Sequence, residues 1–304
     1  MNTSAVIKSP VEVRFPLDLA PRLAPIQRLY QEAKLDTWSP DEDIAWSAFD
    51  PASSTTAQRD AACAVWSRRT WLEYTGIAET PALLLRFCME RAREVDPKYF
   101  LTVRNTEEAM LVECFERYAG LLGPGPARPV DPAWETVINR GLYRDALNAD
   151  VDLDAYVAVH CAIEDGFELE LFRAYQANAA EPVARRILDR SVRVKTRHAA
   201  FGWHYLEGRA ARFGERQRAA LADAGAAWLQ DVAFAGYHVP SLATSIDSAG
   251  LQEAQALAAA GGLGAATAAA EEQILREYLA GVRPRLRALG LELPQRPHAR
   301  LGLV

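Results

Sequence analysis

The sequence predicts an all-α protein, with one helical bundle, additional helices and an extended N-terminal arm. Half of the 304 residues are apolar, and Ala, Leu, Glu and Arg dominate, whereas alternating runs of Val, Ile and Thr are scarce. The abundant residue types favour helices, and a sheet protein would need the alternation. The chain is also long enough to bury one large core. We therefore expect a single domain, with an arm at 1–55, a four-helix core at 56–213 and a C-terminal helical extension packed on it at 214–304.

Charge and cysteine usage exclude several classes of protein. The net charge of −6 provides no basic field for phosphates, so we expect no nucleic-acid partner. No segment supplies the roughly 20 apolar residues of a membrane span, and the N-terminus lacks the features of a signal peptide. The four cysteines are far apart and match neither a metal motif nor a disulfide framework. We expect a cytoplasmic protein with reduced thiols and no membrane contact.

Helical segments alternate with stretches rich in Pro and Gly. In chain order, we expect helices at 21–35, 56–95, 99–121, 134–147, 153–179 and 182–213, and further helical stretches over 215–292. Gly76 and Pro81 should interrupt the first long helix, and Asp96-Pro97 should end it. The sequence GPGPARPVDP at 123–132 cannot be helical and predicts a long connection.

We expect both ends of the chain to pack against the bundle. Trp38 and Trp46 should fix the arm to the body of the protein. The C-terminal extension is interrupted near Pro240 and at 261–264. Because the extension is rich in small residues, we expect a packing layer rather than a site.

The helix at 182–213 carries an unusual inward histidine. At 100° per residue, one stripe joins the residues Ala184, Ile187, Ser191, Val194, His198, Phe201, Gly202 and Tyr205, with Lys195 at its border. The arginines at 186, 190, 193 and 197 fall towards the other side, as an outer face. On the helix at 153–179 the same projection groups His160, Glu164 and Glu168 on an otherwise apolar face. A buried carboxylate needs a partner.

Two segments of the chain resemble motifs of a known family. The segment VRVKTRHAAFGWHYLE at 192–207 is similar to a helix motif written R-D-E-x-R-H-x-x-x-G-W-x-Y-L, with Lys195 in place of Glu. The segment FLTVRNTEEAMLVECFERY at 100–118 is similar to D-E-x-x-H-x-x-x-F, with Glu108 present and Leu111 in place of His. These are motifs of the ferritin-like di-iron carboxylate proteins, which include ribonucleotide reductase small subunits and arylamine N-oxygenases. Glu73 lies 35 residues before Glu108 and Glu164 lies 31 before Lys195, which are separations typical of that family.

The resemblance implies a ferritin-like four-helix bundle with a rewritten metal site. The metal ligands would be Glu73, Glu108, Glu164 and His198, with His160 as a further ligand if it turns inward. Lys195 would act in catalysis by stabilising a bound anion through its charge. The usual site balances four carboxylates against two divalent ions, whereas three carboxylates and the ammonium of Lys195 would be balanced by one, so one ion of iron or manganese is expected rather than two. Ser191 stands where N-oxygenases carry an additional His, and Phe115 stands where radical-generating subunits carry Tyr, which disfavours both of those activities.

Other interpretations of the same residues stay open. Lys195 could replace the metal altogether by pairing with the three glutamates. Glu79 could point inward in place of Glu73, and His160 could be a core histidine. Several side chains are expected to be solvated, to hydrogen-bond the ligands or only to pack, namely Glu107, Glu113, Glu168, Trp203 and Tyr205.

The functional expectation follows from the resemblance. We expect an oxidoreductase of the oxygenase type, a tailoring enzyme in biosynthesis that acts on a small organic molecule or peptide. The alternative is a metal-free binding or scaffold protein, or a non-catalytic subunit, so enzyme activity itself stays open. We expect a homodimer.

Overall fold

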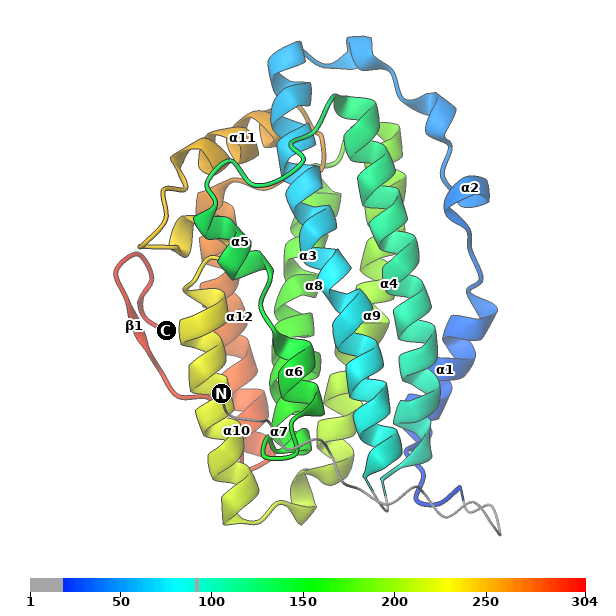
Figure 1. Cartoon of the computed structure of the whole chain (residues 1–304), viewed down its shortest axis with the longest axis vertical. Coiled ribbons are helices and arrows are strands. Elements are labelled where there is room, and N and C mark those ends of the chain that lie inside the picture. The colour runs from blue at the N-terminus through cyan, green and yellow to red at the C-terminus, as the bar shows by residue number, and fades with distance from the viewer. Residues whose placement is uncertain (1–18, 91–92) are drawn as a thin grey trace.

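Four long helical segments run side by side in the computed structural model, which describes residues 19–90 and 93–304 (Figure 1). They are α3 (Thr56–Met89), α4 (Val95–Leu122), α9 (Pro182–Arg209) and a composite of α7 (Leu153–Tyr156), the π-helical η3 (Val157–Glu164) and α8 (Asp165–Asn178). The strands β1 (Pro297–His298) and β2 (Gly302–Leu303) form a small antiparallel pair. The predicted all-α class is confirmed.

Most of the long helices begin and end within a few residues of the predictions. The stop predicted at Asp96-Pro97 is wrong, because α3 already ends at Met89 and these two residues lie in the first turn of α4, where proline is tolerated. Thr55 and Gln58 form a capping box at the start of α3, where each side chain accepts from the other's backbone N–H. The interruption predicted at Gly76 and Pro81 is wrong, because α3 continues through both. Pro81 removes one backbone hydrogen bond, but the neighbouring Ala82 is buried in the core, and tertiary packing keeps the helix intact.

The connection between α4 and the composite helix is long, as predicted. Residues 123–132 are not helical, and the short helices α5 (Ala133–Ile138) and α6 (Leu142–Leu147) follow. Trp134 of α5 is buried and packs with Ile138 against Ala243 of the C-terminal layer. The connection therefore crosses the outside of α3, as Figure 1 shows.

The described part of the N-terminal arm lies along α4 and α9. It contains α1 (Ala24–Leu35), α2 (Pro40–Asp43), and the 3-10 turns η1 (Trp46–Ala48) and η2 (Pro51–Ser53). Trp38 is buried in the main core, and the guanidinium of Arg117 lies 4.2 Å from the ring centre of Trp46. Both tryptophans thus fix the arm, as predicted. The expectation about the N-terminus itself falls on residues 1–18, outside the described residues.

The arm also corrects the predicted outer face of α9. Arg190 and Arg197 are buried, because Asp36 and Asp43 of the arm pair with them. Helical projection cannot predict this, since a segment distant in sequence covers the face.

The C-terminal extension forms a layer beside the bundle. The 3-10 turn η4 (Ala210–Arg212) follows α9 and leads into it. The elements of the layer are α10 (Glu215–Trp228), the π-helical η5 (Leu229–Ala233), η6 (Pro240–Leu242), α11 (Ala249–Ala260) and α12 (Ala268–Ala288). In it α11 packs on α3 and α12 packs on α8. Gly262 and Gly264 adopt positive φ angles of 65° and 73°, which explains the predicted interruption at 261–264.

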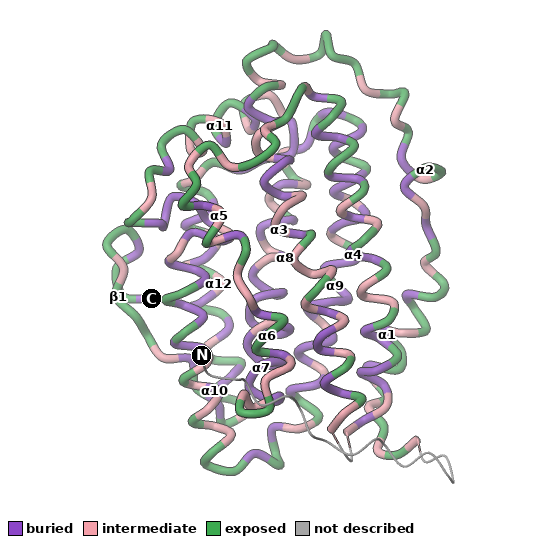
Figure 2. The backbone as a smooth tube through the Cα atoms, viewed as in Figure 1, coloured by how far each residue is buried: buried purple, intermediate pink, exposed green. Residues whose placement is uncertain are grey.

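The bundle helices bury the faces that they turn to one another (Figure 2). The predicted stripe of α9, including Ala184, Val194 and Phe201, is buried. At Gly202 the backbone of α9 touches η3 so closely that a Cβ would lie 1.9 Å from the carbonyl oxygen of Cys161. This close approach brings α9 against the π-helical segment that carries His160 and Glu164. Within residues 19–90 and 93–304, every helix is too short or too polar to cross a bilayer.

Candidate functional site

The bundle interior holds an unusual concentration of charged side chains. Glu73 of α3, Glu108 of α4, Glu164 of η3 and Lys195 of α9 are each at most 5% exposed, and His198 is fully buried. His160 is half-buried. With the exception of His198, these predicted site residues line one small cavity of about 50 Å³. That volume admits one or two molecules of the size of water.

Lys195 forms the cationic centre of this cavity. Its Nζ lies 2.7 Å from Oε2 of Glu73 and 2.8 Å from Oε2 of Glu168. Burial lowers the pKa of Lys195, but the two carboxylates raise it by more, so the pKa lies above its usual value. The ammonium therefore stays charged. Burial raises the pKa of Glu73 to about 7 against the opposing effect of Lys195. Of the two alternatives for α3, Glu73 is the buried one, whereas Glu79 is half-buried and pairs with Arg140.

Glu108 is held by side chains from two helices. Its Oε1 accepts hydrogen bonds from Oγ1 of Thr80 at 2.9 Å and from Nε of Arg104 at 2.9 Å. Arg104 also pairs with Asp165, which fixes the guanidinium between the two acids. A Cβ at Gly76 would lie 2.9 Å from the Glu108 carboxyl carbon, so the missing side chain makes room for this carboxylate. Burial raises the pKa of Glu108, and Arg104 opposes that shift.

His198 is oriented by a hydrogen bond on one side of its ring. Its Nε2 lies 3.1 Å from Oε2 of Glu107, and Glu107 in turn accepts from Nε of Arg197 at 3.0 Å. Glu107 therefore hydrogen-bonds a predicted ligand, which is one of the two roles that the sequence left open. Burial, together with Arg104 and Lys195, holds the pKa of His198 well below its usual range. The ring is neutral at physiological pH, and its Nδ1 has no partner.

Glu164 has three hydrogen-bond donors of its own. Nδ1 of His160 and Nε2 of His238 each lie 2.8 Å from one of its oxygens, and Arg140 pairs with it as well. Burial would raise the pKa of Glu164, but Arg140 and the two histidines hold it well below its usual range. His238 comes from the C-terminal extension, so the expectation that this layer only packs is wrong.

Comparison with solved structures identifies the architecture. No protein-family model and no curated protein matches the chain. A variant of R2-like ligand-binding oxidase with an aerobically reconstituted Mn/Fe cofactor is similar at 19% identity and a TM-score of 0.66, covering 84% of this chain and 92% of that one. Another variant, with an Fe/Fe cofactor, gives 20% identity, a TM-score of 0.66, and coverage of 84% and 91%. The chain has a ferritin-like fold. The fold implied by the two sequence motifs is thus confirmed.

Three of the predicted ligands each have one buried donor atom without a hydrogen-bond partner. Buried atoms without a hydrogen-bond partner include Oε1 of Glu73, Oε2 of Glu108 and Nδ1 of His198, a set of oxygen and nitrogen donors suited to iron or manganese. Leu111 and Lys195 offer no ligand for a second ion. Among the described residues, no group of three or more His, Cys, Asp and Glu side chains is arranged to hold an ion as placed. An ion would therefore have to draw Glu73 from Lys195 and Glu108 from Arg104.

The charge of the cavity also favours a cation. Six carboxylates line it, Glu73, Glu79, Glu108, Glu164, Asp165 and Glu168, against the three permanent cations Arg104, Arg140 and Lys195. The lining therefore has an excess of three carboxylates over permanent cations. Protons on the raised-pKa carboxylates or one divalent ion can offset that excess.

The motifs predict Lys195 but not the two arginines or the second histidine of this site. Arg104 lies one helical turn before Glu108, so its i,i+4 spacing was a usable signal. Arg140 and His238 come from the crossover and from the C-terminal layer, and neither spacing nor periodicity connects them with Glu164. Glu168 was grouped on the inward face of its helix but was not assigned to Lys195.

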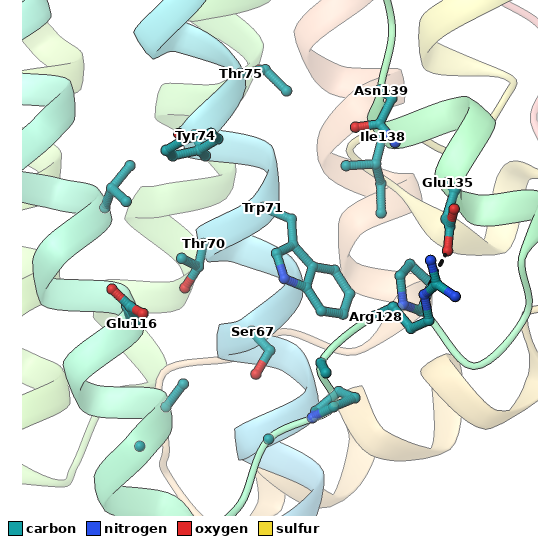
Figure 3. Close-up of a pocket in the computed structure, with 17 residues that line it drawn as sticks. Ser67, Thr70, Trp71, Tyr74, Thr75, Glu116, Arg128, Glu135, Ile138 and Asn139 are labelled. Carbon is teal, nitrogen blue, oxygen red and sulfur yellow. Dashed lines mark ion pairs between the residues drawn. The ribbon is translucent and has the colours of Figure 1, made fainter.

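A larger cleft adjoins the ferritin-like centre. It has a volume of about 740 Å³ and lies between α3, α4, the crossover and α5. Figure 3 shows Trp71 projecting into it from α3, between Tyr74 and the ion pair of Arg128 with Glu135. Thr75 lines both this cleft and the inner cavity. The cleft has the size of a small-molecule site and reaches the wall of the charged centre.

Proposed function

We propose that this protein is a ferritin-like oxidase that holds one iron or manganese ion and acts on a small organic molecule. The observation that carries the proposal is the set of unpaired buried atoms on Glu73, Glu108 and His198. Buried donors and acceptors are rarely left without partners, and these three belong to residues that the motifs assign as ligands. The R2-like ligand-binding oxidases of similar fold carry Mn/Fe or Fe/Fe cofactors, which supports the choice of metals.

Side chains around the proposed ligands would hold them in position for the metal. A bound iron or manganese ion would supply one-electron redox chemistry with dioxygen. Glu107 holds the neutral His198 ring with Nδ1 free, and Thr80 and Arg104 fix one oxygen of Glu108. The ammonium of Lys195 keeps its proton and would stabilise negative charge that develops beside it. Because Glu73, Glu108 and Lys195 are each at most 5% exposed, little water screens their charges, which strengthens these interactions.

The large cleft is our proposed substrate site. Its volume of about 740 Å³ suits a small organic molecule, and the aromatic ring of Trp71 offers an apolar wall. Thr75, at the boundary with the inner cavity, donates a hydrogen bond to the backbone carbonyl of Leu72 and lies 2.9 Å from the hydroxyl of Tyr237. A substrate in the cleft would approach the centre past this pair.

Dioxygen uptake after metal loading tests the proposal. Protein loaded anaerobically with one equivalent of Fe(II) should consume dioxygen faster than free Fe(II) at the same concentration. His198→Ala should abolish that excess, and His204→Ala, on the partly exposed face of α9, should retain it. Equal uptake by the wild type and His198→Ala would refute the assignment.

A second candidate is supported by the ion pairs of Lys195. Since its ammonium already binds Glu73 and Glu168, it can replace a metal, and the protein would then be a metal-free binding or scaffold protein. This candidate predicts a melting temperature and ligand affinity that chelators do not change. Loss of either after chelation would exclude it.

A further inference from the structure

Two consecutive arginines of α3 are buried without a carboxylate partner. Arg68 and Arg69 are each 7% exposed. The Nη2 of Arg68 donates to the backbone carbonyls of Gly236 and Tyr237, both at 2.8 Å, and the Nη2 of Arg69 donates to that of Gly264 at 3.0 Å. The Nη1 of Arg69 is buried and has no partner. Carbonyls satisfy part of each guanidinium but do not neutralise its charge.

Other buried arginines of the described chain form ion pairs with carboxylates. Those that are buried or nearly so pair with Asp or Glu, namely Arg86, Arg93, Arg104, Arg140, Arg190, Arg197 and Arg209. Burial lowers the pKa of Arg68 to about 10 and also lowers that of Arg69, whereas carboxylates raise the pKa of Arg104 and Arg140 despite burial. Unpaired buried charge is costly, so the pair requires a counter-ion.

The two arginines line a cavity of about 60 Å³ between the bundle and the C-terminal layer. Glu271 lines it too and its single charge offsets part of the charge of the two arginines, but its oxygens accept hydrogen bonds from Tyr175 and Gln255, both at 2.7 Å, rather than from either guanidinium. No described carboxylate lies within ion-pair distance of either arginine, and Glu168, at the edge, is taken by Lys195.

The guanidinium of Arg69 is also fixed in place. It lies 4.2 Å from the ring centre of Trp66 and 4.4 Å from that of Tyr175, so two aromatic faces hold it. A donor that is rigid, charged and only partly satisfied is prepared for an acceptor that the protein itself does not supply.

We propose that this cavity is a binding site for a small monovalent anion of the size of chloride or formate, held by Arg68 and Arg69. The volume of about 60 Å³ excludes larger carboxylates such as benzoate. The site lies next to the charged centre, because Glu168 and His238 line both cavities. It does not depend on metal binding.

Thermal unfolding of the wild-type chain tests the proposal without any variant. Sodium formate or sodium chloride, compared with sodium gluconate at equal ionic strength, should raise Tm along a saturating curve, by about 4 °C at a hundredfold excess over the dissociation constant. Sodium benzoate should behave like gluconate. If formate and chloride also match gluconate, the cavity holds only water and the proposal is wrong.

Variants and crystals test whether the stabilisation by anions arises at Arg68 and Arg69. Arg69→Met should lose the response to formate, whereas Arg86→Met, which removes a buried arginine far from the cavity, should keep it even if its Tm is lower. A retained response in Arg69→Met would overturn the proposal. If Arg69→Met does not fold, wild-type crystals soaked in bromide decide the matter: an anomalous peak between the two arginines supports the site, and an empty cavity refutes it.

Discussion

The contact between α9 and the π-helical η3 gives a sharp prediction for Gly202→Ala. The new Cβ would lie 1.9 Å from the carbonyl oxygen of Cys161 and 2.3 Å from the amide nitrogen of Ala162, whereas ordinary contact begins at 3.4 Å. Both neighbours are backbone atoms, so no side chain can rotate away and the helices must separate by about 1.5 Å. We expect the free energy of unfolding to fall by about 3 kcal/mol, despite the gain of up to ~1 kcal/mol in helix propensity.

Urea unfolding followed by circular dichroism measures this change. Gly281→Ala in α12 is the matched control, because nothing lies within 4 Å of its new Cβ. It should raise the free energy of unfolding by about 0.5–1 kcal/mol through helix propensity alone. Equal stability of the two variants would show that α9 and η3 are not in backbone contact, and would refute the packing described for the site.

Three further predictions concern the buried charges. Lys195→Met leaves Glu73 and Glu168 without their cation, and should lower the free energy of unfolding at pH 7.5 by about 3 kcal/mol; an unchanged urea midpoint would contradict the ion pairs. Lys195→Glu offers a ligand in place of the ammonium and should raise the metal content per chain above that of the wild type, whereas unchanged content in elemental analysis would argue against the proposed centre. Burial raises the pKa of Glu271 from 4.5 to about 7, so the folded state binds this proton more tightly and stability is lost as pH rises from about 4.5 to 7. In Glu271→Gln the fall in the free energy of unfolding between pH 4.5 and 7 should be smaller by about 3 kcal/mol. If the free energy of unfolding varies with pH in the same way in the variant and the wild type, the pKa of Glu271 is not raised.

The architecture was predictable because local signals agree with one another. The start of α3 after Thr55 agrees with N-terminal capping, and the start of α9 at Pro182 agrees with the preference for proline in a first turn. The non-helical connection at 123–132 follows from its prolines. The inward stripe of α9 follows from the 3.6-residue period alone. Gly76 and Pro81 do not interrupt α3, because a local penalty does not break a helix whose flanking residues are buried in a core.

The site was only half predictable, because its acids and Lys195 lie on bundle helices with regular spacing, whereas Arg140 and His238 come from the crossover and the C-terminal layer. Glu73, Glu108, Glu164 and His198 could be found from motif spacing, and they are all buried in the structure. Whether they bind metal stays a prediction. Arg140 and His238, which hold Glu164, reach the centre through tertiary packing, which single-sequence periodicity does not encode.

The arm and the C-terminal layer illustrate the same limit. Asp36 and Asp43 approach α9 from more than a hundred residues away in sequence and bury two arginines that periodicity placed in solvent. Arg68 and Arg69 obtain their cavity only where α3 meets the C-terminal layer. The surroundings of these buried charges depend on what covers the bundle as much as on the bundle helices.

Metal content per chain tests the central claim most directly. Wild-type protein expressed with iron and manganese should contain close to one equivalent of metal by elemental analysis. His198→Ala should lose it, and His204→Ala should retain it. Two equivalents in the wild type, or the same content in His198→Ala, would contradict a single-ion centre built on Glu73, Glu108 and His198.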